Sequence, residues 1–580
     1  MSRGIIQNER SADLVTHKIF LDGSEIPASV QVKDVVVHKE INRIPYAKVT
    51  FLDGDPADRD FPLSNQDQYL PGKTVEILVG YHSSEERIFL GLVVSHRLSI
   101  KNGQARLILE CRDAATKMTV KRRSGYFYDL TDAELIETLA TRNGLEAEVA
   151  STSITHKQIT QYQVTDWDLL VTRAQVNGMV CKAEDGKITV APPDLSQDSL
   201  EVAVFGANIL DFDAAMDGRD QFQKVSAYGW DKVAQEITIV DGENPSLELG
   251  GNVRPDDLAG LLGTDLLELR HGGVISGASL QEWVNAKWLF QQLAKIRGRV
   301  RFQGTPRLFP GGMITLEELG DRFSGKVFIS GLIHNVTEGN WTVDVQIGIS
   351  PSWFTENYDI HPPVASGLFS ACRGLQVGVV TQLEDDPEGE DRIMVKIPIV
   401  NGEEQGIWCR LSNMDAGEER GTFFRPEIGD EVVLGFINED PNQVVVLGML
   451  HSSAKPSPEK AADDNHRKGY VSRSGISMVF DDESKSLTIQ TPEGKTLTLN
   501  EEEDVIEVED NHGNKILMDG DGITLESAKD LLLKAGGDVT IEGMDIHLKA
   551  QSQFKAEGSG GAEVSTSAVA VLKGSLVQIN

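Results

Sequence analysis

The stretch that decides the fold is residues 516–580, ILMDGDGITLESAKDLLLKAGGDVTIEGMDIHLKAQSQFKAEGSGGAEVSTSAVAVLKGSLVQIN. Pairs of small or apolar residues spaced two apart recur along it, and the first members of successive pairs are separated by 7, 8, 8, 7, 8, 8, 7 and 8 positions. A spacing of two places both side chains on one face of a short strand. The pairs are Ile516/Met518, Ile523/Leu525, Leu531/Leu533, Val539/Ile541, Ile546/Leu548, Phe554/Ala556, Ala562/Val564, Val569/Val571 and Val577/Ile579.

The spacing repeats every 23 residues, so three strands complete one circuit. Glycine, with Asp, Ser and Lys, fills the segments between the pairs and suits tight corners that need positive φ. Repetition at a fixed period is typical of a β-solenoid. The stretch therefore predicts a three-sided β-prism.

The period alone leaves open how many chains build the prism. One chain stacked on itself would rise only about 14 Å, whereas three intertwined chains would form a needle about 40 Å long. An antiparallel meander is the least favoured alternative, because its turns would vary in length. We expect an intertwined triple-stranded β-helix over residues 476–580, with the pair members from Ile516 to Val571, apart from Ala556 and Ala562, as its core.

The composition is that of a folded protein of several domains, with 580 residues, 40% of them hydrophobic and 25% charged. A net charge of −34 argues against nucleic acid and anionic membranes as partners. The start of the chain lacks the apolar segment of a signal peptide, and no apolar run is long enough to span a membrane. We expect synthesis and assembly in the cytoplasm. Four scattered cysteines indicate neither a disulfide framework nor a zinc site.

Residues 17–110 alternate in the manner of β-strands and predict a small antiparallel barrel. A second segment repeats its pattern. Pro71-Gly72 is followed 20 residues on by a Gly-Leu-Val run at 91, and Pro310-Gly311 is followed 21 residues on by a Gly-Leu-Ile run at 331. We interpret residues 1–365 as one domain that contains two related barrels, at about 15–125 and 205–350, with helices between them.

Three helices are expected in this domain. Thr131 and Glu134 have the spacing of a capping box, and a second helix starts at Thr165. A third is expected to begin at Ser279, with Glu282 as its capping partner. Residues 241–262 are expected to be loop.

Residues 366–452 contain five strand-like runs, the number that an OB barrel uses, and 453–475 read as a linker. The motifs of this region resemble the OB domain of VgrG spike proteins and of the central spike of contractile phage tails. Those motifs are Gly378-Val379-Val380, GEDRIMVKIP (389–398), Trp408-Cys409-Arg410, FRPEIGDEV (424–432), Asp440-Pro441 and Val446-Leu447-Gly448. Residues 42–47 (NRIPYA) and 52–56 (LDGDP) resemble variants of Bacteroidota-type and extracellular injection systems.

The resemblance implies a structural homotrimer at the tip of a contractile injection machine. In this family the spike sits on a hexameric Hcp-like tube among baseplate proteins, punctures the target envelope, carries effector cargo and leaves the cell as part of the injection particle. The resemblance also implies a small PAAR-like cap on the needle end. We expect that cap to bind through Leu576, Val577, Gln578, Ile579 and Asn580.

No enzymatic activity, cofactor or metal is expected. The linker is too short for a muralytic domain, and no further domain is expected after the needle. Asp519-Gly520-Asp521-Gly522 lacks part of the EF-hand pattern, and residues 558–561 are not followed by the helix of a phosphate cradle. The alternative function is a trimeric tail-fibre adhesin or a polysaccharide-active prism, but from Gly475 onward the aromatic residues are Phe480 and Phe554 alone.

Overall fold

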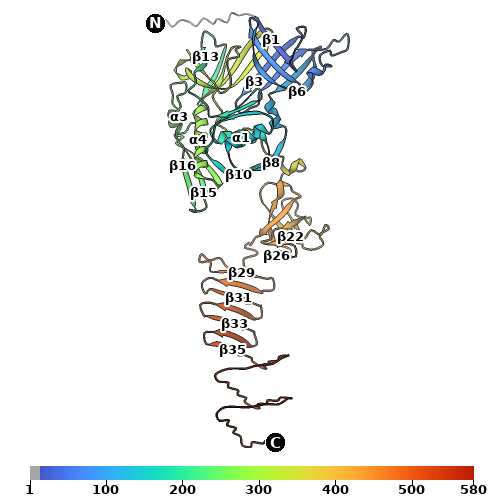
Figure 1. Ribbon diagram of the computed structural model, residues 1–580, viewed down its shortest axis with the longest axis vertical. Coiled ribbons are helices and arrows are strands. Elements are labelled where there is room, and N and C mark those ends of the chain that lie inside the picture. The colour runs from blue at the N-terminus through green and yellow to red at the C-terminus, as the bar shows by residue number, and fades with distance from the viewer. Residues whose placement is uncertain (1–13, 580) are drawn as a thin grey trace. The chain divides into compact units, whose positions relative to one another are not determined.

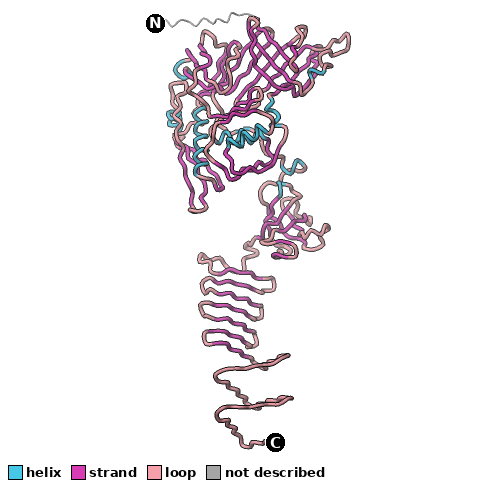
Figure 2. The backbone as a smooth tube through the Cα atoms, viewed as in Figure 1, coloured by secondary structure: helices cyan, strands magenta, loops and turns pink. Residues whose placement is uncertain are grey.

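The computed structural model describes residues 14–579, and its fold is mainly β, as predicted (Figures 1 and 2). It divides into two compact units. The N-terminal unit comprises residues 14–373 and 437–443, and the C-terminal unit comprises residues 374–436 and 444–579.

A 13-stranded sheet forms the framework of the N-terminal unit, in the order β14-β18-β21-β20-β3-β4-β7-β6-β5-β1-β2, with β19 pairing β20 and β13 pairing β19. Its strands are β1 (Val15–Leu21), β2 (Ser24–Glu25), β3 (Val32–Glu40), β4 (Tyr46–Leu52), β5 (Thr74–Tyr81), β6 (Ser84–Lys101), β7 (Gln104–Arg112), β13 (Ser199–Val204), β14 (Asp211–Met216), β18 (Ile296–Gln303), β19 (Met313–Glu317), β20 (Gly325–Thr337) and β21 (Asn340–Ile347).

Five neighbouring strands occur twice in this sheet in the same order. The first set is β3-β4-β7-β6-β5 and the second is β14-β18-β21-β20-β19. Gly72 and Gly311 occupy matching places: each has φ near +90°, and each N–H donates 2.8 Å to the carbonyl of Val93 or Ile329 at a β-bulge. The sixth strands differ, because β1 pairs β5 antiparallel and β13 pairs β19 parallel.

The register of the two sets differs from the one that the sequence suggests. Hairpin partners Lys101 and Gln104 match Thr337 and Asn340, which makes Ser95 rather than Gly91 the structural equivalent of Gly331. The Pro-Gly turns match as expected. The segment between the Pro-Gly turn and the bulge is longer in the first set than in the second. Gly91 therefore lies four residues before the position that is equivalent to Gly331.

Each set has its own hydrophobic core. Residues such as Ile19, Phe51 and Leu109 form the first, and Val300, Phe302 and Val345 belong to the second. The two sets are joined edge to edge by β3 and β20, so the sheet runs through both cores without interruption.

Helices and smaller sheets complete the N-terminal unit. The small sheets are β10-β8, β11-β12-β9 and β16-β15-β17. Their strands are β8 (Arg122–Thr131), β9 (Glu146–Val149), β10 (Thr155–Thr165), β11 (Val180–Glu184), β12 (Lys187–Ala191), β15 (Lys224–Asp231), β16 (Glu236–Asp241) and β17 (Leu266–Val274). The α-helices are α1 (Asp132–Thr141), α2 (Asp166–Val176), α3 (Pro255–Leu262), α4 (Gly277–Leu293), α5 (Gly320–Phe323) and α6 (Phe354–Asn357), and the 3-10 helices are η1 (Asp67–Tyr69), η2 (Ala114–Thr119), η3 (Val364–Gly367) and η4 (Ile437–Glu439).

The first two predicted helix starts are correct. Thr131 and Glu134 form the capping box, and Thr165 caps α2 through the N–H of Asp168. The third start is wrong: α4 begins at Gly277, because the Ser276 hydroxyl accepts from the N–H of Ser279 one turn earlier than expected. Helix α3 lies in the segment expected to be loop, with Pro255 in its first turn, where a missing N–H costs nothing.

The C-terminal unit begins with the predicted five strands, and they close into a barrel in the order β22-β23-β24-β28-β27. A seven-stranded antiparallel sheet follows, in chain order from β29 to β35 (Figure 1). The strands are β22 (Gln376–Gln382), β23 (Ile393–Lys396), β24 (Ile407–Leu411), β25 (Ala416–Gly417), β26 (Arg420–Gly421), β27 (Glu431–Phe436), β28 (Val444–Met449), β29 (Arg467–Val471), β30 (Ser477–Asp481), β31 (Ser486–Gln490), β32 (Thr496–Asn500), β33 (Val505–Glu509), β34 (Lys515–Asp519) and β35 (Gly522–Glu526).

The seven-stranded sheet is a meander, the arrangement that we least expected, and it includes the first two predicted strand pairs. Its turns are set by side chains at the ends of strands. The carboxylate or amide oxygens of Asp481, Asn500, Asp510 and Asp519 accept hydrogen bonds from backbone N–H groups two to four residues on. Such local bonds compete with longer connections and return the chain at once.

Candidate assembly interface on the C-terminal sheet

Two apolar columns run across one face of the meander, from β30 to β35. The register places each apolar residue directly opposite the next one on the neighbouring strand, the arrangement in which cross-strand side chains contact each other. The first column is Met478, Ile489, Leu497, Val508, Ile516 and Leu525, and the second is Phe480, Leu487, Leu499, Ile506, Met518 and Ile523.

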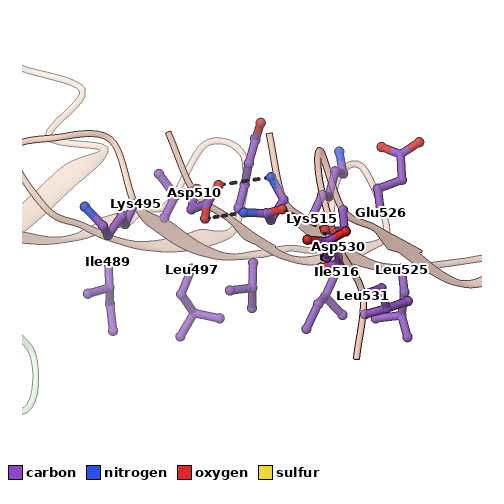
Figure 3. Close-up of a pocket in the computed structure, with 15 residues that line it drawn as sticks. Ile489, Lys495, Leu497, Asp510, Lys515, Ile516, Leu525, Glu526, Asp530 and Leu531 are labelled. Carbon is purple, nitrogen blue, oxygen red and sulfur yellow. Dashed lines mark hydrogen bonds between the residues drawn. The ribbon is translucent and has the colours of Figure 1, made fainter. Parts of the chain in front are cut away.

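The opposite face of the same sheet is largely polar. Thr488, Thr498 and Glu507 form one column on it, and Lys515 makes an ion pair with Glu507 that raises the pKa of the lysine. Figure 3 shows the division: Ile489, Leu497, Ile516 and Leu525 point to one side of the ribbon, and Lys495 and Glu526 point to the other. Antiparallel sheets with one face on a core and one face in water alternate in this way.

Within the described part of the C-terminal unit, no segment covers the apolar face. Eleven of the twelve column residues are exposed, and Ile523 is 71% exposed. The face borders a shallow groove of about 650 Å³. Contiguous apolar patches of this kind mark protein–protein interfaces.

The turn at Asp510 forms part of the polar rim of that groove. Its carboxylate accepts from both the N–H and the side-chain amide of Asn514, at 3.0 and 2.8 Å, and from the N–H of His512 (Figure 3). These bonds, the side-chain amide first, lower the pKa of Asp510 to about 2. The turn is therefore held by an ionised carboxylate at neutral pH.

Beyond β35 the chain continues as an open coil with no strand beside it (Figure 1). Residues 527–577 form neither strands nor backbone-to-backbone hydrogen bonds with each other or with residues 14–526. The predicted core residues here are exposed, from Ile546 at 51% to Val564 at 94%. The backbone N–H and C=O groups of this segment therefore lie exposed beside apolar side chains.

The structure thus places the predicted core residues in two settings. Ile516, Met518, Ile523 and Leu525 belong to the apolar columns of the meander. The remainder, Leu531, Leu533, Val539, Ile541, Ile546, Leu548, Phe554, Val564, Val569 and Val571, lie on the unpaired coil.

The cap site stays a prediction. Leu576, Val577, Gln578 and Ile579 are exposed, and Asn580 lies outside the described residues.

Sequence analysis missed the columns between residues 478 and 508. Their signal is present as strict alternation in segments such as TLTLN (496–500) and VIEVE (505–509). These segments precede Ile516, where the 23-residue spacing begins, and do not follow that spacing.

Between residues 14 and 579, no group of three or more His, Cys, Asp or Glu side chains is placed to hold a metal ion. None of the helices in that range has the length and apolar character that a membrane span requires.

Two family models match parts of the chain. Residues 11–338, more than half of the chain, match the family model of the Alg8 N-terminal domain. The chain belongs to this family. Residues 376–451 match the OB domain of type VI secretion system and phage-baseplate injectors, which is the segment that closes into the five-stranded barrel.

Curated relatives are similar to a short part of the chain. The chain is 27% identical over 88 residues to the type VI secretion system spike protein VgrG3 of Vibrio cholerae, over 13% of this chain and 9% of that protein. It is 27% identical over 123 residues to VgrG1c of Pseudomonas aeruginosa, a match that covers 19% of this chain and 16% of that protein. The matches span only 8 to 16% of the length of these relatives.

Among solved structures, the chain is similar to a 43 kDa prophage tail protein of Shewanella oneidensis, with a TM-score of 0.44, 11% identity and coverage of 58% of this chain and 98% of that one. It is also similar to a type VI secretion component of Escherichia coli, with a TM-score of 0.39 and 12% identity, and the match covers 75% of this chain and 100% of that one. The OB-domain match and the curated relatives confirm the resemblance to VgrG-type spike proteins.

Proposed function

We propose that the chain is the subunit of a homotrimeric spike of a contractile injection machine. The observation that carries the proposal is the exposed apolar face of β30–β35. It leads into residues 527–577, which form no strand and no backbone-to-backbone hydrogen bonds with each other or with residues 14–526. A spike role agrees with the match of residues 376–451 to the injector OB domain.

Three copies fit this arrangement better than two. Two sheets packed face to face would cover the columns of the meander, but they would leave the 23-residue circuit unexplained. Each circuit has three strands, each with one apolar pair, and therefore three sides. The strand on each side needs a neighbouring strand. Three copies supply those strands and bring each apolar column to a shared axis.

The function that follows is mechanical. The needle would puncture a target envelope after assembly in the cytoplasm, and the spike would be released with its particle. Its polar outer face does not favour binding to lipid headgroups. We expect the twofold repeat of the N-terminal sheet, present in three chains, to give six similar units that suit a hexameric Hcp-like tube.

Other partners follow from the family resemblance. We expect baseplate proteins at the N-terminal unit and a PAAR-like cap at residues 576–580, with effector cargo carried on either. No observation favours the alternative adhesin or polysaccharide-active prism, because Phe480 lies in an apolar column and Phe554 is a predicted core residue. We expect no catalytic activity.

The trimer can be tested with two neighbouring substitutions. Ile541→Asp would bring three carboxylates together at the axis, each at a cost of several kcal/mol. Thr540→Asp adds the same charge at the outward position beside it, where we expect no effect. Sedimentation should give three times 63.4 kDa for the wild type and Thr540→Asp, and smaller species for Ile541→Asp. A wild-type monomer at micromolar concentration would overturn the proposal.

A further inference from the structure

The repeat within the N-terminal sheet supplies a template for contacts between copies. Counting from the matching hairpin turns, the β6 segment from Val93 to Lys101 is equivalent to the β20 segment from Ile329 to Thr337. The same counting through β7 and β4, and through β21 and β18, makes Asp34 of β3 equivalent to Asp211 of β14. Residues 93–101 therefore have counterparts at 329–337, and residues 34–39 have counterparts at 211–216.

In the second set, β20 is paired on both sides. Its residues Gly331–Thr337 pair β21 on one side and β3 on the other, where they face Glu40–Asp34. At the bulge, the N–H of Ile41 donates to the carbonyl of Ser330 at 2.9 Å. This strand pair is the junction between the two sets.

The first set lacks that junction. Residues 95–101 of β6 pair β7 alone, and β14 is an end strand of the sheet, so within residues 14–579 one edge of each has no strand partner. Leu98 and Ile100 are 41% and 63% exposed, whereas their equivalents His334 and Val336 are 2% and 6% exposed. The edge of β6 in the first set is therefore exposed, whereas β3 covers the equivalent edge of β20 in the second set.

We infer that β6 of one copy pairs antiparallel with β14 of the next copy, in the register of β20 and β3. The inference rests on the proposed homotrimer and names its second interface. It places Ser95 opposite Asp217 and Lys101 opposite Asp211, with the carbonyl of Val94 accepting from the N–H of Gly218. The intervening pairs are His96/Met216, Arg97/Ala215, Leu98/Ala214, Ser99/Asp213 and Ile100/Phe212.

The side chains on the two edges are complementary. The apolar residues Leu98 and Ile100 face Ala214 and Phe212, all of which are at least partly exposed in one chain. Arg97 and Lys101 of β6 approach the acidic residues at 211 and 213 of β14 and at 217 just beyond its end. Asp211 and Asp217 also pair with arginines of their own chain, Arg299 and Arg219. Opposite charges and apolar pairs across a strand pair each stabilise it.

Closure follows from the count of edges. Each copy has one free β6 edge and one free β14 edge, so the contact is head to tail and forms a ring when the rotation closes. In a ring of three, junctions within chains alternate with junctions between chains. Unpaired sheet edges, which invite aggregation, then disappear at β6 and β14.

Cysteine cross-linking of the full chain tests the register. Ser99→Cys with Asp213→Cys, in a Cys372→Ser background, should yield covalently linked trimers under mild oxidation. The control pair, Lys101→Cys with Asp217→Cys, uses the same two strands but lies at opposite ends of the proposed register, about 20 Å apart. That pair, and each single cysteine, should yield no linked trimers.

Hydrogen exchange of the wild-type trimer gives a second measurement that needs no substitution. Amides in residues 95–101 and 211–216 should exchange as slowly as those of the β3–β20 junction. A trimer by sedimentation that neither cross-links at 99 and 213 nor protects these amides overturns the inference and leaves the proposed function intact. A protein that sediments as a monomer overturns the proposed function first.

Discussion

Asp53 and Gly304 occupy the same backbone position in the two halves of the N-terminal sheet but have different tasks. The Asp53 carboxylate accepts from the N–H groups of Gly54, Leu63 and Ser64 and from the Ser64 hydroxyl, at 2.7–2.9 Å. Burial raises the pKa of Asp53, and these bonds outweigh it and lower the pKa overall. In the second half, glycine leaves room for the fully buried indole of Trp341.

Gly304→Ala should therefore destabilise the N-terminal unit. A Cβ at this position would lie 2.0 Å from the Trp341 ring, and we expect a loss of about 3 kcal/mol, as for other overpacked cores. Gly277→Ala is the matched control, because a Cβ there at the start of α4 meets nothing within 4 Å. The midpoint of thermal unfolding should fall for the first variant alone; an equal midpoint for both would show that the sheet yields to the methyl group.

Helices α1 and α2 are held together by ion pairs at both ends. Arg173, in the last turn of α2, donates to Asp132, the first residue of α1, at 2.6 and 2.8 Å. Arg142, at the end of α1, donates to Asp166, the first residue of α2. Burial raises the pKa of both carboxyls, but their hydrogen bonds, led by those from the arginines, lower the pKa overall.

Arg173→Met should cost about 3 kcal/mol, because it leaves the buried Asp132 without its cation. Arg219→Ala, which breaks the exposed pair with Asp217, should lower the free energy of unfolding far less. Since the folded-state pKa of Asp132 is depressed, its stabilisation is complete above about pH 4 and is lost as the pH falls further. Thermal unfolding from pH 6 to pH 3 should bring wild type and Arg173→Met together. A constant gap between them would exclude this linkage.

At the scale of helices and strands, the sequence predicted correctly those elements that depend on residues close together in the chain. The OB strands and the Thr131 cap depend on neighbours within a few residues, and both were correct. The start of α4 was missed because Ser276 and Ser279 are both suitable caps, and packing decides between them. The structural register of the repeat was missed because it depends on hairpin lengths, which the Pro-Gly and Gly-Leu landmarks do not reveal.

At the scale of the whole molecule, deletions of different length test whether the 23-residue circuit sets the register of the needle. Deleting residues 531–553 removes one 23-residue circuit and brings Phe554 into the place of Leu531, so the trimer should survive with a shorter needle. Deleting only residues 534–537 removes less chain but puts corners where strands belong, and we expect it to disrupt assembly. Sedimentation and electron microscopy would compare the two. If both shortened chains assemble equally well, the circuit has no structural meaning.

The coil from 527 to 577 also constrains the order of folding. Loops and sheets in the rest of the chain can form at a rate that does not depend on concentration, because their partners are in the same polypeptide. The coil has no strand partner within residues 14–579. In the proposed homotrimer its folding requires separate chains to meet, so its rate should rise steeply with protein concentration. Newly made chains would spend the interval with this segment open to proteases. Production of the subunits from one message, close together, would shorten that interval.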